Sequence, residues 1–232
     1  MSESFDPFAA ARSKKPRNEE WAAKRRVADA TRRFIHNLHT STDSVEDLNR
    51  VADAIDEQAN SLARSQSLYG LTAFERADEE RHGDRYHLQY EMNPVYGKSN
   101  PIAPPFDIWM TEDRAYGQTR MDWQYEGPPN SVHGGFVAAL FDQFLGMAQR
   151  LTGQPGFTGT LSVRYIKPTP IDTDLRLEGW VDRVEGRKNF LKGEMWAGET
   201  LTASCEGIFI SVEAAVVQKL QNRYIKNDGE KS

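Results

Sequence analysis

The chain of 232 residues carries a formal net charge of −5, five Trp, eight Tyr and eleven Phe residues, and one cysteine. The acidic balance disfavours nucleic acid as a partner, because binding to phosphates requires clustered Lys and Arg side chains. The single Cys205 excludes an intrachain disulfide, and no apolar run reaches the roughly 20 residues that span a bilayer. The N-terminus also lacks the pattern of a secretory signal, so we expect a globular, cytoplasmic protein with no membrane span.

The N-terminal part of the chain predicts a helical extension. Residues 1–17 mix Ser, Pro, Lys and Arg without periodicity, which is typical of a mobile start. Apolar residues recur at helical spacing over residues 18–38, and Ser44 with Asp47 resembles a capping box that begins a second helix. A helical hairpin at about residues 18–64 follows. Packing or oligomerisation is the ordinary role of such an appendage.

Two histidines of the first predicted helix have the spacing of a possible metal-ligand pair. His36 and His39 lie three residues apart, but no cysteine is near them and acidic residues are few. A position on the solvated surface is therefore favoured. We expect no metal site.

The chain changes character around a proline-rich stretch. Residues 65–92 are highly charged, which is typical of a solvated face, and we assign them no chemistry. The stretch NPVYGKSNPIAPPF, residues 93–106, contains four prolines and predicts an extended loop. These changes divide the chain into a helical extension at residues 1–92, a domain at residues 93–215 and a tail at residues 216–232.

The domain predicts one helix within a run of strands. The segments with strand character are FDIWM, GQTRMDWQY, TGTLSVRYI, DLRLEGWVDRVEG, NFLKGEMWAG and TLTASCEGIFISV. Between the second and third lies HGGFVAALFDQFLGMAQRL, which is apolar nearly all round and lacks turn signals. This order predicts an α+β class in which an antiparallel sheet of five to six strands curls around one central helix.

Asp142 is the first candidate for chemistry. It lies in the apolar helix between Phe141 and Phe144, where burial of an unpaired carboxylate would be costly. A cap on a neighbouring turn, an ion pair with a lysine or a role in a protected reactive site can each account for it.

The start of the same helix offers hydrogen-bond donors. The first N–H groups of a helix have no intrahelical partner, and the helix dipole favours negative charge there. Gly134 and Gly135 have no side chain to keep a substrate carbonyl from the backbone, so this end can bind a developing oxyanion. Capping the helix or fixing the loop is as well supported for the preceding His133 as a direct catalytic role.

The two ends of this motif are too far apart to act together within one chain. His133 and Asp142 are nine residues apart, which on a helix is about 13 Å and about two and a half turns. A two-fold dimer can bring Asp142 of one protomer to Gly134 of its partner. We therefore predict active sites that are shared across a dimer interface.

The string HGGFVAALFD resembles the H-G-G-x-x-A-x-x-x-D helix start of hot-dog fold thioesterases in the PaaI-like branch. The flanking GPPNSVHGG and the later TGTLSVRYIKPTP, which matches a T-x-x-L-x-V-x-Y-x-x-P strand, are similar to the same branch. The resemblance covers about residues 100–213. It implies the hot-dog fold and hydrolysis of an acyl-CoA substrate. Thioester hydrolysis needs no metal or redox cofactor, so we expect none beyond the coenzyme A of the substrate. The sequence leaves open whether the assembly is a homodimer or a dimer of dimers.

The resemblance also implies roles for single residues. Asp142 would act as nucleophile or as general base on water, and the Gly134 N–H would polarise the thioester carbonyl. His133 would hold the loop and help to place the carbonyl. Thr158, by its position in the strand motif, would orient the water or the carboxylate.

The role of Thr158 depends on the geometry of its strand. Simple alternation places Thr158 on the strand face opposite Leu161 and Val163. The role therefore requires a bulge at Gly159 or a contribution from the interface geometry.

Further residues are candidates for substrate binding. Family members often carry Gly where this chain has Asn130, which leaves the shape of the acyl entrance open. Coenzyme A is polyanionic, so Arg164 and Lys167 are candidates to flank its groove, although such residues are usually solvent-exposed for other reasons. Gly135, at the helix start, is the fourth candidate for substrate binding.

Two other functions stay open at this point. A related hot-dog enzyme could hydrate or dehydrate an acyl thioester, and a non-catalytic protein could bind acyl-CoA while its N-terminal hairpin recruits a partner. The sequence sets neither the length nor the type of the acyl group.

Overall fold

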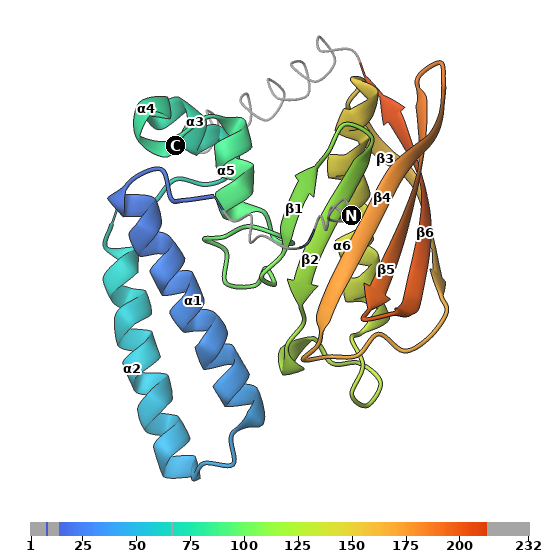
Figure 1. Cartoon of the computed structure of the whole chain (residues 1–232). Coiled ribbons are helices and arrows are strands. Elements are labelled where there is room, and N and C mark those ends of the chain that lie inside the picture. Colours follow the sequence, from blue (N-terminus) through green and yellow to red (C-terminus); the bar gives the residue numbers. More distant parts are fainter. Residues whose placement is uncertain (1–7, 9–13, 66, 213–232) are drawn as a thin grey trace, which may run out of the picture.

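The second half of the chain forms a six-stranded antiparallel sheet that curls around one long helix, α6 (Figure 1). The computed structural model describes residues 8, 14–65 and 67–212. The strand order is β1-β2-β4-β5-β6-β3, so β1 and β3 are the two edges of the sheet. The predicted α+β fold with a central helix is confirmed.

The strands differ in length, and the longest lie in the middle of the sheet. They are β1 (Asp107–Met110), β2 (Arg114–Arg120), β3 (Gly156–Tyr165), β4 (Asp174–Glu185), β5 (Lys188–Ala197) and β6 (Thr200–Ser211). The second predicted strand was wrong at both ends. It begins earlier, at Arg114, and the stretch after Arg120 turns into the short helix η1 (Trp123–Tyr125), which Asp122 caps by accepting the N–H of Trp123.

Helix α6 (Gly134–Ala148) supplies the centre of the hydrophobic core. Its buried side chains are Val137, Leu140, Phe141, Phe144, Leu145 and Ala148. The sheet approaches so closely that a Cβ at Gly179 of β4 would lie 2.7 Å from the Phe144 ring. Glycine at this strand position therefore sets the distance between helix and sheet. A further short helix, η2 (Gln149–Thr152), follows α6 directly.

One side of α6 is not enclosed by the sheet. Phe136 and Asp142 are exposed, although the apolar sequence predicted a helix covered all round. The reason is the strand order: β3 is an edge strand, so in a single chain the sheet ends beside this side of the helix.

The N-terminal helical extension is confirmed. It contains α1 (Glu19–Thr40), α2 (Val45–Ala63), α3 (Leu71–Ala77), α4 (Glu79–His82) and α5 (Arg85–Met92). Ser44 caps α2 by accepting the N–H of Asp47 at 3.1 Å, as the sequence predicted. Helix α2 buries none of its side chains, whereas α1 buries Trp21 and Ala28.

Polar contacts attach α1 to the rest of the chain. Arg25 forms a 2.5 Å ion pair with Glu91, whose side chain is fully buried. Arg32 donates to the backbone carbonyls of Gly97, Asn100 and Ala103 in the proline-rich stretch. That stretch contains neither helix nor strand, as predicted. The extension therefore rests on the loop that leads into the domain.

Some predictions are left open. Most of residues 1–17 and the tail at residues 216–232 lie outside the described part of the chain, and the proposed domain boundaries stay a prediction. Within the described residues, no helix combines the length and apolarity required to cross a membrane.

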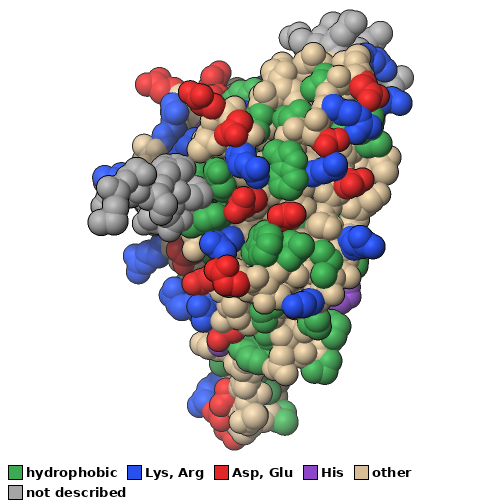
Figure 2. Space-filling view, turned by 45° about the vertical axis from the view of Figure 1, so that its right-hand side comes forward, with side chains coloured by type: hydrophobic (Ala, Val, Ile, Leu, Met, Phe, Trp, Pro, Cys, Tyr) green, Lys and Arg blue, Asp and Glu red, His purple; other side chains and the backbone are tan. Residues whose placement is uncertain are grey.

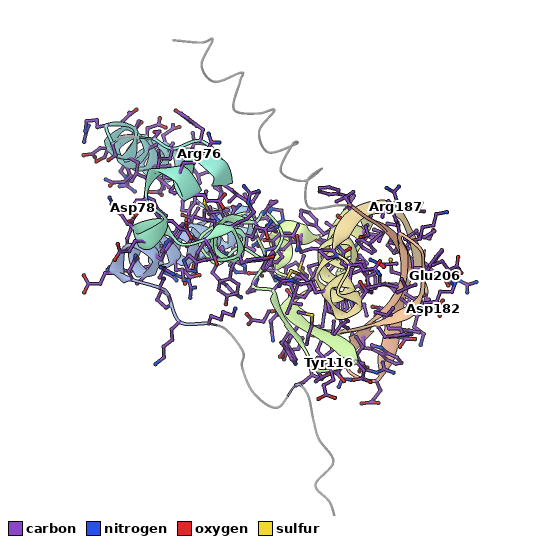
Figure 3. The ribbon with its side chains drawn as sticks, turned by 90° about the horizontal axis from the view of Figure 1, so that it is seen from above. Arg76, Asp78, Tyr116, Asp182, Arg187 and Glu206 are labelled. Carbon is purple, nitrogen blue, oxygen red and sulfur yellow. The ribbon has the colours of Figure 1, made fainter. Side chains whose placement is uncertain are left out.

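The outer face of the sheet is polar and carries both signs of charge. Viewed from above (Figure 3), the sheet curves around α6, and Asp182 and Glu206 project away from that helix. Figure 2 shows basic and acidic side chains interspersed with apolar ones on this side of the molecule. Asp182, for example, pairs with Lys192 at 2.9 Å. The site residues expected from the sequence lie instead on and around α6.

Candidate active site

The loop before α6 is fixed by backbone hydrogen bonds on both sides. The N–H of His133 donates to the Tyr125 carbonyl, and that of Val132 to the Thr169 carbonyl, each at 2.8 Å. His133 has extended backbone angles, φ −58° and ψ 133°, and is the N-cap of the helix. The chain therefore enters α6 in one defined direction.

The side chain of His133 caps the helix. The N–H of Gly135 donates to the His133 Nδ1 at 3.0 Å. Because Nδ1 accepts this hydrogen bond, the proton of the neutral imidazole resides on Nε2. The predicted capping role of His133 is thus present, and its Nε2–H is left as a donor.

The N–H of Gly134 has no hydrogen-bond acceptor among the residues that the structure describes. This amide is the first of the helix, where N–H groups lack an intrahelical partner and the dipole favours an anion. A cleft of about 410 Å³ lies beside it, lined in part by Val137, Tyr165 and Lys167. An amide without an acceptor beside a cleft is the kind of group that an oxyanion donor requires.

Asp142 lies on the free side of α6, two turns from this amide. Its carboxylate Oδ1 accepts a 2.8 Å hydrogen bond from the Thr158 hydroxyl. The expected burial of Asp142 was wrong for a single chain, because the free side of the helix is uncovered there. Among the described residues, no lysine or arginine forms an ion pair with Asp142, so its negative charge is not neutralised.

A bulge in β3 directs Thr158 towards Asp142. The register of β3 against β6 shifts between Thr158 and Thr160, so that Thr158 lies opposite Phe209 and Leu161 opposite Gly207. Both partners have odd numbers and face the core, which means that Thr158 and Leu161 share the helix-facing side of β3. The sequence required this irregularity at Gly159, and the structure contains it.

The same alternation separates the two basic candidates for substrate binding. Lys167 lines the cleft beside Gly134. Arg164 lies one residue from Tyr165, so its side chain points to the opposite face of β3, away from α6. Within one chain, Arg164 therefore does not reach the cleft.

Asn130 shapes the loop that precedes the helix. Its φ of 58° is left-handed, a conformation that favours glycine but that asparagine tolerates. Its N–H donates to the Glu126 carboxylate at 2.6 Å, and its carbonyl accepts the N–H of Ile171. The turn explains why glycine and asparagine are both compatible with this position.

Tyr165 is part of the T-x-x-L-x-V-x-Y-x-x-P strand motif, but no pattern in the sequence indicated a role for it. Its hydroxyl donates to the Gly134 carbonyl at 2.8 Å. The signal available in the sequence was alternation, which places Tyr165 on the same strand face as Leu161 and Val163. Only the folded chain shows that this face meets the start of α6.

Cys205 and His36, the single cysteine and one of the two closely spaced histidines, remain to be placed. Burial, reinforced by the negative charges of Asp142 and Glu206, raises the pKa of the Cys205 thiol to about 12. His36 lies 2.9 Å from the Asp122 carboxylate, and no cluster of potential metal ligands occurs within the described ranges. Neither residue points to a metal site.

Comparison with known proteins identifies the family. The thioesterase superfamily model matches residues 129–204, a segment that holds the start of α6, Asp142 and Thr158. A thioesterase superfamily protein of known crystal structure is 31% identical in sequence to this chain, with a TM-score of 0.67. The match covers 85% of this chain and 97% of that protein. The chain therefore belongs to the thioesterase superfamily, as its motifs predicted.

Curated relatives are similar over a shorter segment. The human acyl-coenzyme A thioesterase THEM5 is 28% identical over 90 residues, which is 38% of this chain and 36% of the human protein. The bovine acyl-coenzyme A thioesterase THEM4 is 30% identical over 90 residues, which is 38% of this chain and 37% of the bovine protein. The matched segment thus spans little more than a third of the length of these relatives.

Proposed function

We propose that this protein is an acyl-CoA thioesterase that hydrolyses an acyl-CoA to the free acid and coenzyme A. The observation that carries the proposal is the geometry of α6: an unneutralised carboxylate held by Thr158, and an amide without an acceptor at Gly134. Membership of the thioesterase superfamily supports this reaction class, and the THEM4 and THEM5 relatives are named acyl-coenzyme A thioesterases.

In the proposed reaction, the thioester carbonyl accepts a hydrogen bond from the Gly134 N–H. Asp142 acts either as nucleophile on the carbonyl carbon or as general base on the attacking water. As nucleophile, Asp142 bonds the carbonyl carbon while the carbon–sulfur bond breaks, and a water then hydrolyses the resulting anhydride to the free acid and the restored carboxylate. As general base, Asp142 takes a proton from the water that adds to the carbonyl carbon, and the carbon–sulfur bond then breaks. In both routes the thiolate leaves and takes up a proton. The Thr158 hydroxyl holds Asp142 Oδ1, so that Oδ2 remains the reactive oxygen. No step requires a metal or redox cofactor, and we propose that none takes part.

We further propose that each site is shared by two copies of the chain. Gly134 and Asp142 are eight positions apart, which is about 12 Å along a helix, too far for both to act on one carbonyl group. Exposed apolar side chains occur in these parts of the chain: Phe136 on the free side of α6, Phe157 in the edge strand β3, and Ile166 directly after that strand. An uncovered ten-residue edge strand is a template for pairing with a second strand. A two-fold dimer through β3 would place each Asp142 near the partner's helix start.

The substrate and the reaction are tested together by thiol release from a panel of aliphatic and aromatic acyl-CoA compounds. We expect hydrolysis, and a loss of about 10²-fold or more in kcat for Asp142→Asn, which keeps the shape of the side chain. Asp174→Asn, at an exposed position of β4, is the matched control and should retain full activity. Binding without thiol release would instead favour a non-catalytic acyl-CoA-binding protein. Loss of conjugation from an enoyl-CoA without thiol release would favour a hydratase.

A complementation experiment tests the shared site. Asp142→Asn removes the carboxylate, and Gly134→Pro removes the amide donor; each homodimer should be inactive. If the two elements come from different protomers, unfolding and refolding an equal mixture should restore about a quarter of the wild-type activity, since half of the dimers then have one intact site. No recovery, in a mixture that size and mass measurements show to contain mixed dimers, would refute the shared site.

Two expectations about the setting of the protein accompany this proposal. A cytoplasmic address would match the location of soluble acyl-CoA pools, and a reporter fusion to the full chain would test it.

Arg164 and Lys167 remain candidates for contacts with the phosphates of coenzyme A, and Arg164 would reach them in the site of the partner protomer. Charge removal at each, Arg164→Gln and Lys167→Gln, should raise KM and leave kcat nearly unchanged.

A further inference from the structure

Helix α6 begins with two glycines, whose backbone is less restricted than that of other residues. Gly134 and Gly135 give a substrate carbonyl access to the backbone, but they also leave this segment more conformational freedom than any other residues would. An oxyanion donor stabilises the transition state only if it already points in the right direction. The Gly134 N–H belongs to the peptide that precedes Gly134, and its direction relative to the helix depends on the φ and ψ angles of Gly134. Contacts that fix the next peptide, between the two glycines, restrict these angles.

Two hydrogen bonds hold that peptide from opposite ends. The peptide consists of the Gly134 carbonyl and the Gly135 N–H. The Gly135 N–H donates to the His133 Nδ1 at 3.0 Å, and the Gly134 carbonyl accepts from the Tyr165 hydroxyl at 2.8 Å. A carbonyl has two lone pairs, so the Tyr165 contact is compatible with the helical hydrogen bond that the same oxygen accepts. The His133 contact is local, whereas the Tyr165 contact ties the peptide to the sheet.

The Tyr165 ring also limits the position of Gly134. A Cβ at Gly134 would lie 3.4 Å from three atoms of that side chain, which is ordinary van der Waals contact. The Gly134 backbone therefore rests directly against the phenol. Tyr165 is 57% exposed, so its contacts contribute little to the hydrophobic core.

We propose that Tyr165 is a positioning residue of the active site, whose hydroxyl fixes the Gly134–Gly135 peptide and thereby the direction of the Gly134 N–H. Strand β3 then holds α6 at two points, near its middle at Asp142 through Thr158 and at its start at Gly134 through Tyr165. Thr158 and Tyr165 are seven positions apart, so their side chains would point to opposite faces of a regular strand. The bulge between Thr158 and Thr160 brings both to the helix-facing side. This inference rests on the proposed thioesterase function.

The test replaces only the hydroxyl, with Tyr165→Phe. We expect kcat to fall about tenfold with little change in KM, because the ring still lines the cleft while the donor is less well oriented. The midpoint of urea unfolding of the variant should equal that of the wild type. If Tyr165 had a merely structural role, the midpoint of the variant would be lower. Tyr69→Phe, at a tyrosine that is 88% exposed, is the matched control and should retain full activity. An unchanged kcat in Tyr165→Phe would overturn the proposal.

A double variant shows whether the effect passes through the amide. In Gly134→Pro the donor is absent, so adding Tyr165→Phe should cause no further loss of kcat. A further loss equal to that in the wild-type background would mean that Tyr165 acts by another route, and the proposal would be wrong.

Amide hydrogen exchange, followed by NMR, separates this proposal from the proposed function. Without any substrate, Tyr165→Phe should speed exchange at Gly135 relative to Tyr69→Phe, because the Gly135 N–H is hydrogen-bonded to His133 Nδ1 and its peptide is less restrained in the variant. If the wild-type chain hydrolyses no acyl-CoA, the proposed function fails, yet faster exchange still supports the positional tie. Exchange rates equal to those of the control would overturn it regardless of activity.

Discussion

Replacement of Gly134 by proline tests the oxyanion donor with little expected effect on the helix. Gly134 is the first residue of α6, the position at which proline is favoured because its N–H has no intrahelical acceptor. The preceding His133, at φ −58° and ψ 133°, already has the extended backbone that a residue before proline requires. The variant therefore deletes one N–H while the helix and its cap are kept.

Loss of one such donor costs about 10²–10³-fold in kcat, or about 2.7–4 kcal/mol of transition-state stabilisation. The assay is initial-rate thiol release from the best acyl-CoA of the panel, with circular dichroism and urea unfolding as controls of the fold. Gly134→Ala retains the N–H, and its added Cβ meets the Tyr165 side chain at an ordinary 3.4 Å, so it should keep most of the activity. If Gly134→Pro hydrolyses acyl-CoA within about threefold of Gly134→Ala, the amide is not the oxyanion donor and the reasoning from helix geometry fails.

Four further outcomes follow from the structure. Thr158→Val removes the donor to Asp142 and should lower kcat/KM about tenfold, whereas Thr158→Ser should not; equal rates in the two variants would contradict the contact. Burial lowers the pKa of His87 from its ordinary 6.5, so the unfolded chain takes up the proton first, and the free energy of unfolding should fall as pH drops below about 6.5. Urea unfolding at several pH values should show this slope, and His87→Gln should flatten it. Because burial raises its pKa to about 12, the Cys205 thiol should resist iodoacetamide at pH 8 until urea is added; intact-mass measurement of rapid labelling would disprove this. Dialysis against EDTA should leave thiol release unchanged, and a loss restored by a metal ion would point to a different chemistry.

The sequence was sufficient for the fold class and for the position of the reactive helix. The apolar run from Gly134 to Ala148, set among alternating strands, could bury its surface only as the centre of a curled sheet. The helix cap was equally local: His133 and Gly135 are two residues apart, and their hydrogen bond depends on no distant part of the chain. The capping box at Ser44 was predictable for the same reason.

Predictions that required a register or a neighbour could not be settled from the sequence. Thr158 faces Asp142 only because β3 shifts by one residue against β6, and a strand periodicity of two gives no sign of where a shift occurs. The end of β2 was missed because the turn at Asp122 interrupts an aromatic run that by composition resembles a strand. The exposure of Asp142 depended on β3 lying at the edge of the sheet, which is a property of the strand order.

The amino-acid sequence by itself determined which residues can do chemistry here: one carboxylate in an apolar helix, and two glycines at the start of that helix. The tertiary structure decided how they are held, since the hydroxyls of Thr158 and Tyr165 reach the middle and the start of α6 from a strand that follows it in the chain. The physical reason is that helix caps arise from neighbouring residues, whereas contacts between a strand and a helix depend on the pairing register of the whole sheet.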